Sequence, residues 1–305
     1  MLFLLSACSE IDKSGEFDTD TVIDTGDTDD TDNVDDTGDT GPAEELTLSS
    51  CTTDVGDGVA AFYSAYFLCA EFDVDGARTK IHTHGLPPHK SAYYPEGDPN
   101  WEAWDDRGGD YQPNPNTIAT QDTNVWIPDE PDAKGITVTA DMVDGVGGTN
   151  EHEFPGGGVG VGLDSVLLFS GAAGPGDDIA EEQYSFDSWD GHPQEQGVYH
   201  DHSPNPAQLA VLVYNGYATT NVPGAAEVEL YGVMCDGTVV LGCTELDGSE
   251  PKSAEFDAQN GHLGDLAGAD GTVYFTGRYH THVCPGEFDD PYFPEIQYYQ
   301  VCDRL

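Results

Sequence analysis

Six of the ten histidines lie in two copies of one motif, and these are the residues best suited to metal chemistry. The first copy reads F-D-S-W-D-G-H over residues 186–192 and G-V-Y-H-D-H over 197–202. The second reads F-D-A-Q-N-G-H over 256–262 and G-R-Y-H-T-H over 277–282. Neutral imidazole is a common ligand of zinc, copper, nickel and iron, so the repeat points to a transition-metal site.

The H-x-H spacing within each copy suits metal binding if the segment is a strand. Residues i and i+2 of a strand point to the same face, so His200 and His202 would project together from backbone positions about 6.6 Å apart. Their nitrogens can then converge on one ion at about 2.0–2.1 Å. His280 and His282 would do the same. If the two copies pack about a pseudo-twofold axis, four imidazoles could meet at one centre.

The predicted metal ligands include a third H-x-H pair and the histidine after each Gly. The full set is His82, His84, His192, His200, His202, His262, His280 and His282. Asp187 and Asp257 are predicted to orient imidazoles from behind, with Tyr199 and Tyr279 on the opposite strand face. Copper and zinc are the expected metals, because calcium and magnesium prefer oxygen ligands.

The first eight residues resemble the lipid-attachment signal of bacterial lipoproteins. An apolar run ends in Leu5-Ser6-Ala7-Cys8, which would make Cys8 the lipidated residue. The run lacks a preceding Lys or Arg and is short for a signal peptide, which a start upstream of Met1 would explain. The alternative is a short disordered apolar end. The expected location is the cell envelope, lipid-anchored at the outer membrane or cell surface, or the extracellular space.

Residues 9–45 form a Thr/Asp/Gly tract that predicts a disordered acidic tether. Fifteen acidic residues lie between Glu10 and Glu45, out of 58 acidic and 9 basic residues in the chain. The domain over 46–305 is therefore acidic as well. A negatively charged surface repels phosphate backbones, so nucleic acid is not an expected partner. The membrane is an expected partner through the lipid on Cys8.

If Cys8 carries lipid, six cysteines remain, which predicts three disulfides in an oxidising compartment. Pairing of sequence neighbours is expected, above all Cys235 with Cys243 across a hairpin turn. Zinc–thiolate ligation is disfavoured because no C-x-x-C spacing occurs. The six are Cys51, Cys69, Cys235, Cys243, Cys284 and Cys302.

Short apolar segments separated by Gly and Pro predict a mainly β fold, either an antiparallel β sandwich or a related mixed-β domain, with long loops and an internal duplicated motif. The predicted strands include a hairpin over 66–83 that turns at Asp75-Gly76. The other predicted strands are 135–143, 159–169, 208–214, 228–234, 272–276 and 296–301. Residues 84–118 are expected to be a loop that packs its aromatic residues on the core or covers the histidine site.

The motif order resembles the YHYH-domain family of exported bacterial proteins. The shared features run from G-L-P-x-H at 85–89 and G-V-G-L-D-S-V at 160–166 through the two histidine motifs, over roughly residues 80–302. Asp201 and Thr281 replace the second Tyr of the family tetrapeptide. The resemblance implies an exported domain but no settled activity.

Three functions therefore remain open from the sequence. The first is a cell-surface lipoprotein with a metal-binding domain. The second is a metal-free structural or adhesive β domain, in which the histidines are hydrogen-bonded parts of the scaffold. The third is a metal-dependent enzyme of unnamed reaction, because the chain carries no H-E-x-x-H or G-x-S-x-G motif.

Overall fold

The computed structural model describes residues 44–174, 178–286, 292–300 and 302. Within these ranges the chain is mainly β, with a four-stranded and an eight-stranded sheet, each mixing parallel and antiparallel pairs. The prediction of a mainly β, mixed domain is confirmed. Residues 1–8 and all of the acidic tract except 44 and 45 lie outside the described residues.

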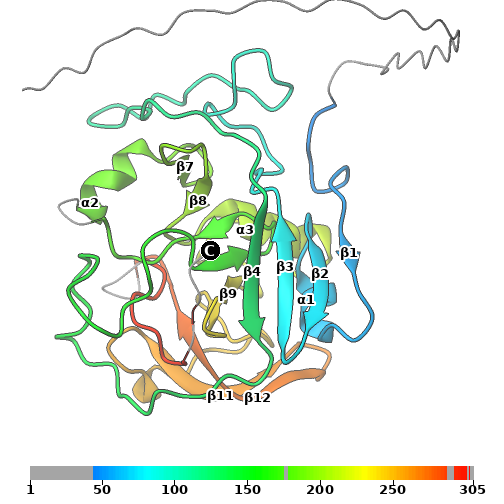
Figure 1. The fold of residues 1–305 in the computed structure, drawn as a ribbon, viewed down its shortest axis with the longest axis vertical. Helices are drawn as coiled ribbons and strands as arrows, with labels where there is room; N and C mark the ends of the chain where they lie inside the picture. Colours follow the sequence, from blue (N-terminus) through cyan, green and yellow to red (C-terminus); the bar gives the residue numbers. More distant parts are fainter. Residues whose placement is uncertain (1–43, 175–177, 287–291, 301, 303–305) are drawn as a thin grey trace, which may run out of the picture. The chain divides into compact units, whose positions relative to one another are not determined.

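The smaller sheet has the order β1-β2-β3-β4 (Figure 1). The predicted hairpin is present, since β2 and β3 pair antiparallel around Gly76, whose φ of 67° suits a residue without Cβ. A short helix precedes it and buries Phe62, Tyr63 and Tyr66. The elements are β1 (Asp54–Val55), α1 (Ala61–Tyr66), β2 (Glu71–Asp75), β3 (Arg78–Thr83) and β4 (Thr123–Pro128).

The larger sheet carries both histidine motifs and has the order β11-β12-β10-β9-β5-β6-β8-β7. Its first-half elements are β5 (Gly160–Gly162), β6 (Leu167–Leu168), α2 (Ile179–Glu182), η1 (Gln183–Ser185), β7 (Gly191–Pro193) and β8 (Tyr199–Asp201). Its second-half elements are β9 (Leu230–Met234), β10 (Val239–Leu241), η2 (Ser253–Glu255), β11 (Gly261–Ala267) and β12 (Val273–His282). Helix α3 (Pro206–Tyr214) joins the two halves along the chain.

The two halves of this sheet repeat one topology about its centre. Strands β5 and β9 pair antiparallel there, with Val161 opposite Val233. On each side follow an antiparallel partner (β6 or β10) and then a parallel strand (β8 or β12). The registers match, because Leu167 lies opposite His200 as Val239 lies opposite His280. The sequence duplication is therefore a structural duplication, with the two motif hairpins on opposite sides of β9 in Figure 1.

Both sheets contribute to one buried core. Phe72 and Ile81 of the smaller sheet belong to the same apolar cluster as Val161 and Val233 of the larger one. Helix α1 adds Phe62 to this cluster. Within the described residues, no helix is both apolar enough and long enough to cross a bilayer.

Two predicted strands have other structures for identifiable reasons. Residues 208–214 belong to helix α3, because Asn205 caps the helix by accepting from the Ala207 and Gln208 N–H groups and Pro206 occupies its first turn. The stretch 159–169 is not one strand but the β5–β6 hairpin, which turns at Ser165 with φ 69°. In 135–143 there is no strand, and the described part of 296–301 forms only isolated bridges.

The long loop over 84–118 packs its aromatic residues and also contacts the first motif. Tyr93 and Tyr94 form a small apolar cluster with Tyr199 of β8. The Ser91 hydroxyl donates to the Asp187 carboxylate, and the Tyr93 hydroxyl donates to a backbone carbonyl of η1. The loop therefore supports the outer side of the first motif.

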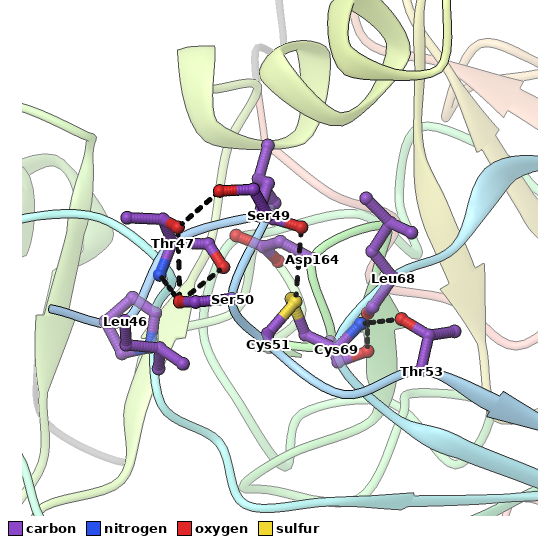
Figure 2. The surroundings of a disulfide bond; sticks show 12 residues. Leu46, Thr47, Ser49, Ser50, Cys51, Thr53, Leu68, Cys69 and Asp164 are labelled. Carbon is purple, nitrogen blue, oxygen red and sulfur yellow. Dashed lines mark hydrogen bonds between the residues drawn. A yellow bond between two sulfur atoms is a disulfide. The ribbon is translucent and has the colours of Figure 1, made fainter. Parts of the chain in front are cut away.

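Three disulfides form, as predicted, but two pair differently from expectation. Cys51 and Cys69 are joined as sequence neighbours, beside the Thr53 hydroxyl that accepts from the Cys69 N–H (Figure 2). The expected Cys235–Cys243 bond is wrong, as is pairing of Cys284 with Cys302. Cys243 bonds Cys284, because the parallel β10–β12 pairing places the chain after these two strands side by side. Cys235, in the turn between β9 and β10, bonds Cys302 of the C-terminal segment.

Candidate metal centres

The first motif brings three imidazoles together at one end of the sheet. His192 on β7 lies opposite His200 on β8, and His202 follows β8 on the same face. The Nε2 atoms of His192 and His200 are 3.0 Å apart, and those of His200 and His202 are 3.1 Å apart. All three rings are buried, and Phe169 stacks on His200 with ring centroids 3.7 Å apart. We call this set the three-histidine cluster.

The second motif builds the same arrangement and adds a carboxylate. His262 on β11 lies opposite His280 on β12, with His282 at the end of β12. The Nε2 atoms of His262 and His282 are 3.3 Å apart. Glu245 oxygens lie 3.3, 3.2 and 3.8 Å from Nε2 of His262, His280 and His282, respectively. We call this set the His₃Glu cluster.

The other ring nitrogens of both H-x-H pairs face backbone carbonyl oxygens. The four Nδ1–carbonyl pairs are His200 with Val198, His202 with Ser170, His280 with Arg278 and His282 with Gly242, at 2.8–3.0 Å. A carbonyl oxygen only accepts, so each Nδ1 carries the hydrogen and each neutral ring turns a lone pair on Nε2 toward its neighbours. A carbonyl behind Nδ1 is the usual support of a metal-binding histidine.

The spacing of the Nε2 atoms in both clusters is close to the spacing of ligands around one metal ion. His200 and His202, whose Nδ1 atoms both donate to carbonyls, offer only acceptors to each other at 3.1 Å, which is repulsive without a cation between them. Four ligands at about 2.0–2.1 Å from a tetrahedral metal lie about 3.3 Å from one another. The observed spacings are close to that edge length, so the donor set fits a metal ion.

Burial keeps the histidines of the three-histidine cluster neutral. It lowers the pKa of His202 to about 4, and with the charge of His202 it lowers the pKa of His192 to about 3. Burial and the two neighbouring rings lower the pKa of His200 well below its usual value. A shared proton is therefore disfavoured above about pH 4, and neutral imidazole is the form that binds metal.

The His₃Glu cluster combines buried imidazoles with a carboxylate of lowered pKa. Burial lowers the pKa of His282 to about 4, and it outweighs the hydrogen bond to the Gly242 carbonyl, which acts in the opposite direction. Burial alone would raise the pKa of Glu245, but its hydrogen bond to His280 and its electrostatic attraction to the three imidazoles outweigh burial and lower that pKa. This cluster therefore offers three imidazoles and one anionic oxygen.

The predicted role of Asp187 and Asp257 in orienting imidazoles is corrected by their contacts. Asp187 accepts from the Tyr199 hydroxyl at 3.0 Å and Asp257 accepts from the Tyr279 hydroxyl at 2.6 Å. Both also accept from N–H groups of the turns that follow them, Asp190-Gly191 in the first copy and Asn260-Gly261 in the second. Among the hydrogen bonds of the described residues, neither carboxylate contacts an imidazole. They hold the hairpin whose opposite face carries the histidines.

His82 and His84 do not join either cluster. The His82 ring lies 2.9 Å from Asp122 and 3.4 Å from Glu71, and His84 Nδ1 faces the Gln121 carbonyl. Both residues line a separate cavity of about 320 Å³ beside the Cys51–Cys69 bond. The third H-x-H pair is therefore a separate, partly exposed pair at the end of β3 in the smaller sheet.

The two motifs do not meet at one four-imidazole centre. Strands β8 and β12 are separated by four strands, which corresponds to about 24 Å along the sheet. The pseudo-twofold relation is present, but its axis passes between β5 and β9 and keeps the motif hairpins at opposite ends. The structure therefore holds two candidate centres instead of one.

The structure adds one candidate ligand that the sequence pattern missed. Glu245 lies in a turn-rich segment after β10, outside both motif copies and without a repeated counterpart. Glu182 of α2 approaches the three-histidine cluster, with an oxygen 3.7 Å from His202 Nε2. Neither residue stands in an H-x-H or H-x-x-E spacing, so no local signal identifies them.

Each cluster opens on its own cavity. His200 and His202 line a cavity of about 530 Å³ whose walls include Gly148, Phe154 and Phe169. His262 and His280 line one of about 240 Å³ with several acidic residues at its rim. Both centres can therefore be reached from solvent although their rings are buried.

Comparison of the whole chain with protein-family models, curated proteins and solved structures finds no match.

Proposed function

We propose that this protein is an exported, lipid-anchored YHYH-type protein whose duplicated domain binds copper or zinc at two centres. The observation that carries the proposal is the convergence of Nε2 atoms at 3.0–3.3 Å in both copies, with Nδ1 of the H-x-H rings held by carbonyls. Imidazole donors favour copper and zinc over magnesium and calcium.

The metal-free scaffold is the main competing function. Histidines that only stabilise a β domain would be expected to hydrogen-bond as donor to acceptor. Here the tautomers fixed by the carbonyls leave acceptor facing acceptor in a buried site. Two acceptors that face each other in a buried site would destabilise a metal-free scaffold. A cation bound between the rings would remove this repulsion.

A metal-dependent enzyme is a second candidate, favoured by the cavity at the three-histidine cluster. Three neutral protein ligands leave a fourth position, and the 530 Å³ cavity lies against His200 and His202. Zinc held in this way lowers the pKa of a bound water and supports hydrolysis. Turnover of an activated ester that disappears in His200→Ala/His202→Ala, but not in His280→Ala/His282→Ala, would distinguish it from storage or structural metal binding.

Metal content tests the proposal directly. The full chain is purified without a histidine tag, stripped with chelator, reconstituted with zinc or copper(II) and analysed by elemental mass spectrometry. We expect two ions per chain, one in each H-x-H double variant, and none in the quadruple variant. The matched control His82→Ala/His84→Ala should keep both ions.

The result that would overturn the proposal is equally specific. Parent chain that stays metal-free after reconstitution, beside a quadruple variant that folds with only altered stability, would leave the histidines as scaffold. Lipid attachment is tested separately by mass spectrometry of the membrane fraction with Cys8→Ser as the control.

A further inference from the structure

A third group of ligand-type side chains lies away from both histidine clusters and contains only oxygen donors. Asp144, Glu153 and Glu295 each place a carboxylate oxygen within 4.8 Å of the others. Oxygens on opposite sides of a calcium ion, at about 2.4 Å from it, lie about 4.8 Å apart. The three carboxylates therefore fit within one calcium coordination sphere.

Glu295 supplies the observation that points to a ligand. Its side chain is only 3 % exposed, and its Oε1 has no hydrogen-bond partner among the described residues. Its other oxygen accepts from the Gly145 N–H at 3.0 Å. A buried carboxylate oxygen without a donor is costly, because it has lost its water without a replacement.

Glu153 accepts from three backbone N–H groups of its loop and Asp144 accepts from the Val146 N–H, so the oxygen left without a donor among the described residues is Oε1 of Glu295. The Thr149 hydroxyl lies 2.6 Å from Asp144 Oδ2, 2.9 Å from Glu153 Oε1 and 3.1 Å from the Val146 carbonyl, yet it can donate to one of them only. Among the described residues, no Lys or Arg forms an ion pair with any of the three carboxylates. Two of these carboxylates, Glu153 and Glu295, are buried.

We propose that Asp144, Glu153 and Glu295 bind a hard divalent cation, calcium, between the Gly-rich loop 144–153 and the C-terminal segment 292–300. Calcium takes six to eight oxygens in flexible geometry, which suits three carboxylates and a loop with Gly145 and Gly148. Magnesium demands a near-ideal octahedron and retains its waters, so it fits less well. Nitrogen-preferring metals belong to the histidine clusters.

The position of this site gives it a structural consequence. Glu153 accepts from the Gly148 N–H, and Gly148 lines the cavity that contains His200 and His202. Phe154 of the same loop pairs with the Glu295 backbone and lines that cavity too. Calcium would therefore fix one wall of the cavity at the three-histidine cluster without touching its ligands.

A competing explanation is a proton in place of the cation. Burial raises the pKa of Glu295 to about 7, so a protonated Glu295 could donate to Asp144. This alternative predicts a carboxyl group that titrates near neutrality and no response to calcium. Calcium binding separates the two explanations.

The test is calcium titration of the chelator-treated full chain by calorimetry at about 150 mM KCl, where the screening length is about 8 Å and diffuse binding to the acidic surface is weakened. We expect one saturable site, an affinity lowered by about tenfold or more in Glu295→Gln, and a thermal midpoint that calcium raises in the parent much more than in Glu295→Gln. The matched control Glu151→Gln removes the same charge from the same loop at an exposed side chain and should bind as the parent does.

Further variants make the outcome decisive. Asp144→Asn changes an exposed side chain and replaces Glu295→Gln if that protein does not fold. The quadruple histidine variant should retain the calcium site, so failure of the histidine centres and failure of this site are distinguishable. Equal calcium binding by the parent, Glu295→Gln and Asp144→Asn, or no saturable binding by the parent, would overturn the proposal.

Discussion

The two histidine clusters are built on equivalent hairpins and differ in one ligand. Both place Nε2 atoms of a G-H and an H-x-H histidine face to face, with carbonyls behind the H-x-H rings. The second adds the Glu245 carboxylate, whereas the first has Phe169 stacked on His200. The duplication therefore conserves the backbone frame, while segments outside the motif set the charge of each centre.

This difference predicts different affinities and reactivities. An anionic fourth ligand strengthens divalent-cation binding and fills a coordination position, so the His₃Glu cluster should bind zinc more tightly. The three-histidine cluster leaves a position facing its cavity. The following predictions test how far the two halves are equivalent, from the largest expected effect to the smallest.

Gly191→Ala and Gly261→Ala should each destabilise the domain by about 3 kcal/mol or more, through overpacking and loss of a buried hydrogen bond. A Cβ at either position overlaps the hydroxyl of Tyr199 or Tyr279, the group that donates to Asp187 or Asp257. Urea unfolding measures both. A large loss in one half and none in the other would contradict their structural equivalence.

Metal should be retained to lower pH than at ordinary histidine sites. The pKa of His202 and that of His282 are each lowered to about 4, so falling pH protonates these rings only near 4, instead of near 6.5. We expect both ions to remain at pH 5 and to leave between about pH 4 and 3. Dialysis across this pH range, followed by elemental analysis, measures the release of metal. Loss of both ions near pH 6.5 would contradict the lowered pKa values of the two histidines.

Glu245→Gln should lower zinc affinity of the His₃Glu cluster by about 10–100-fold, because it removes the anionic ligand and its charge from the cluster. The three-histidine cluster should be unaffected, since it lies about 24 Å away along the sheet. Competition titration with a zinc chelator resolves the two sites. The control is Glu255→Gln, whose carboxylate lies 4.0 Å from His262 Nδ1. It should change affinity much less.

Thr281→Val should be neutral or stabilise the domain by up to about 1 kcal/mol, because the Thr281 hydroxyl is buried and finds no hydrogen-bond partner in the described part of the chain. The equivalent residue, Asp201, accepts from Gln208, so Asp201→Val should destabilise the domain. Thermal unfolding of the two variants compares them. Destabilisation by Thr281→Val would mean that its hydroxyl has a role the contacts do not reveal.

Much of the local architecture follows from short sequence patterns. The hairpin at Asp75-Gly76 and the same-face placement of His200 and His202 result from turn chemistry and from the two-residue period of a strand. Helix α3 shows the limit of such reasoning. Its apolar run favoured a strand, and the capping signal of Asn205 and Pro206 decided otherwise.

The sequence by itself determined which histidines belong together within a copy, because those contacts depend on local strand geometry. Tertiary structure alone decided that the copies form two centres, that Glu245 joins one of them, and that Cys235 pairs with Cys302. These contacts depend on strand order across the larger sheet. That order is selected by burial of the shared core, to which residues distant in sequence contribute together.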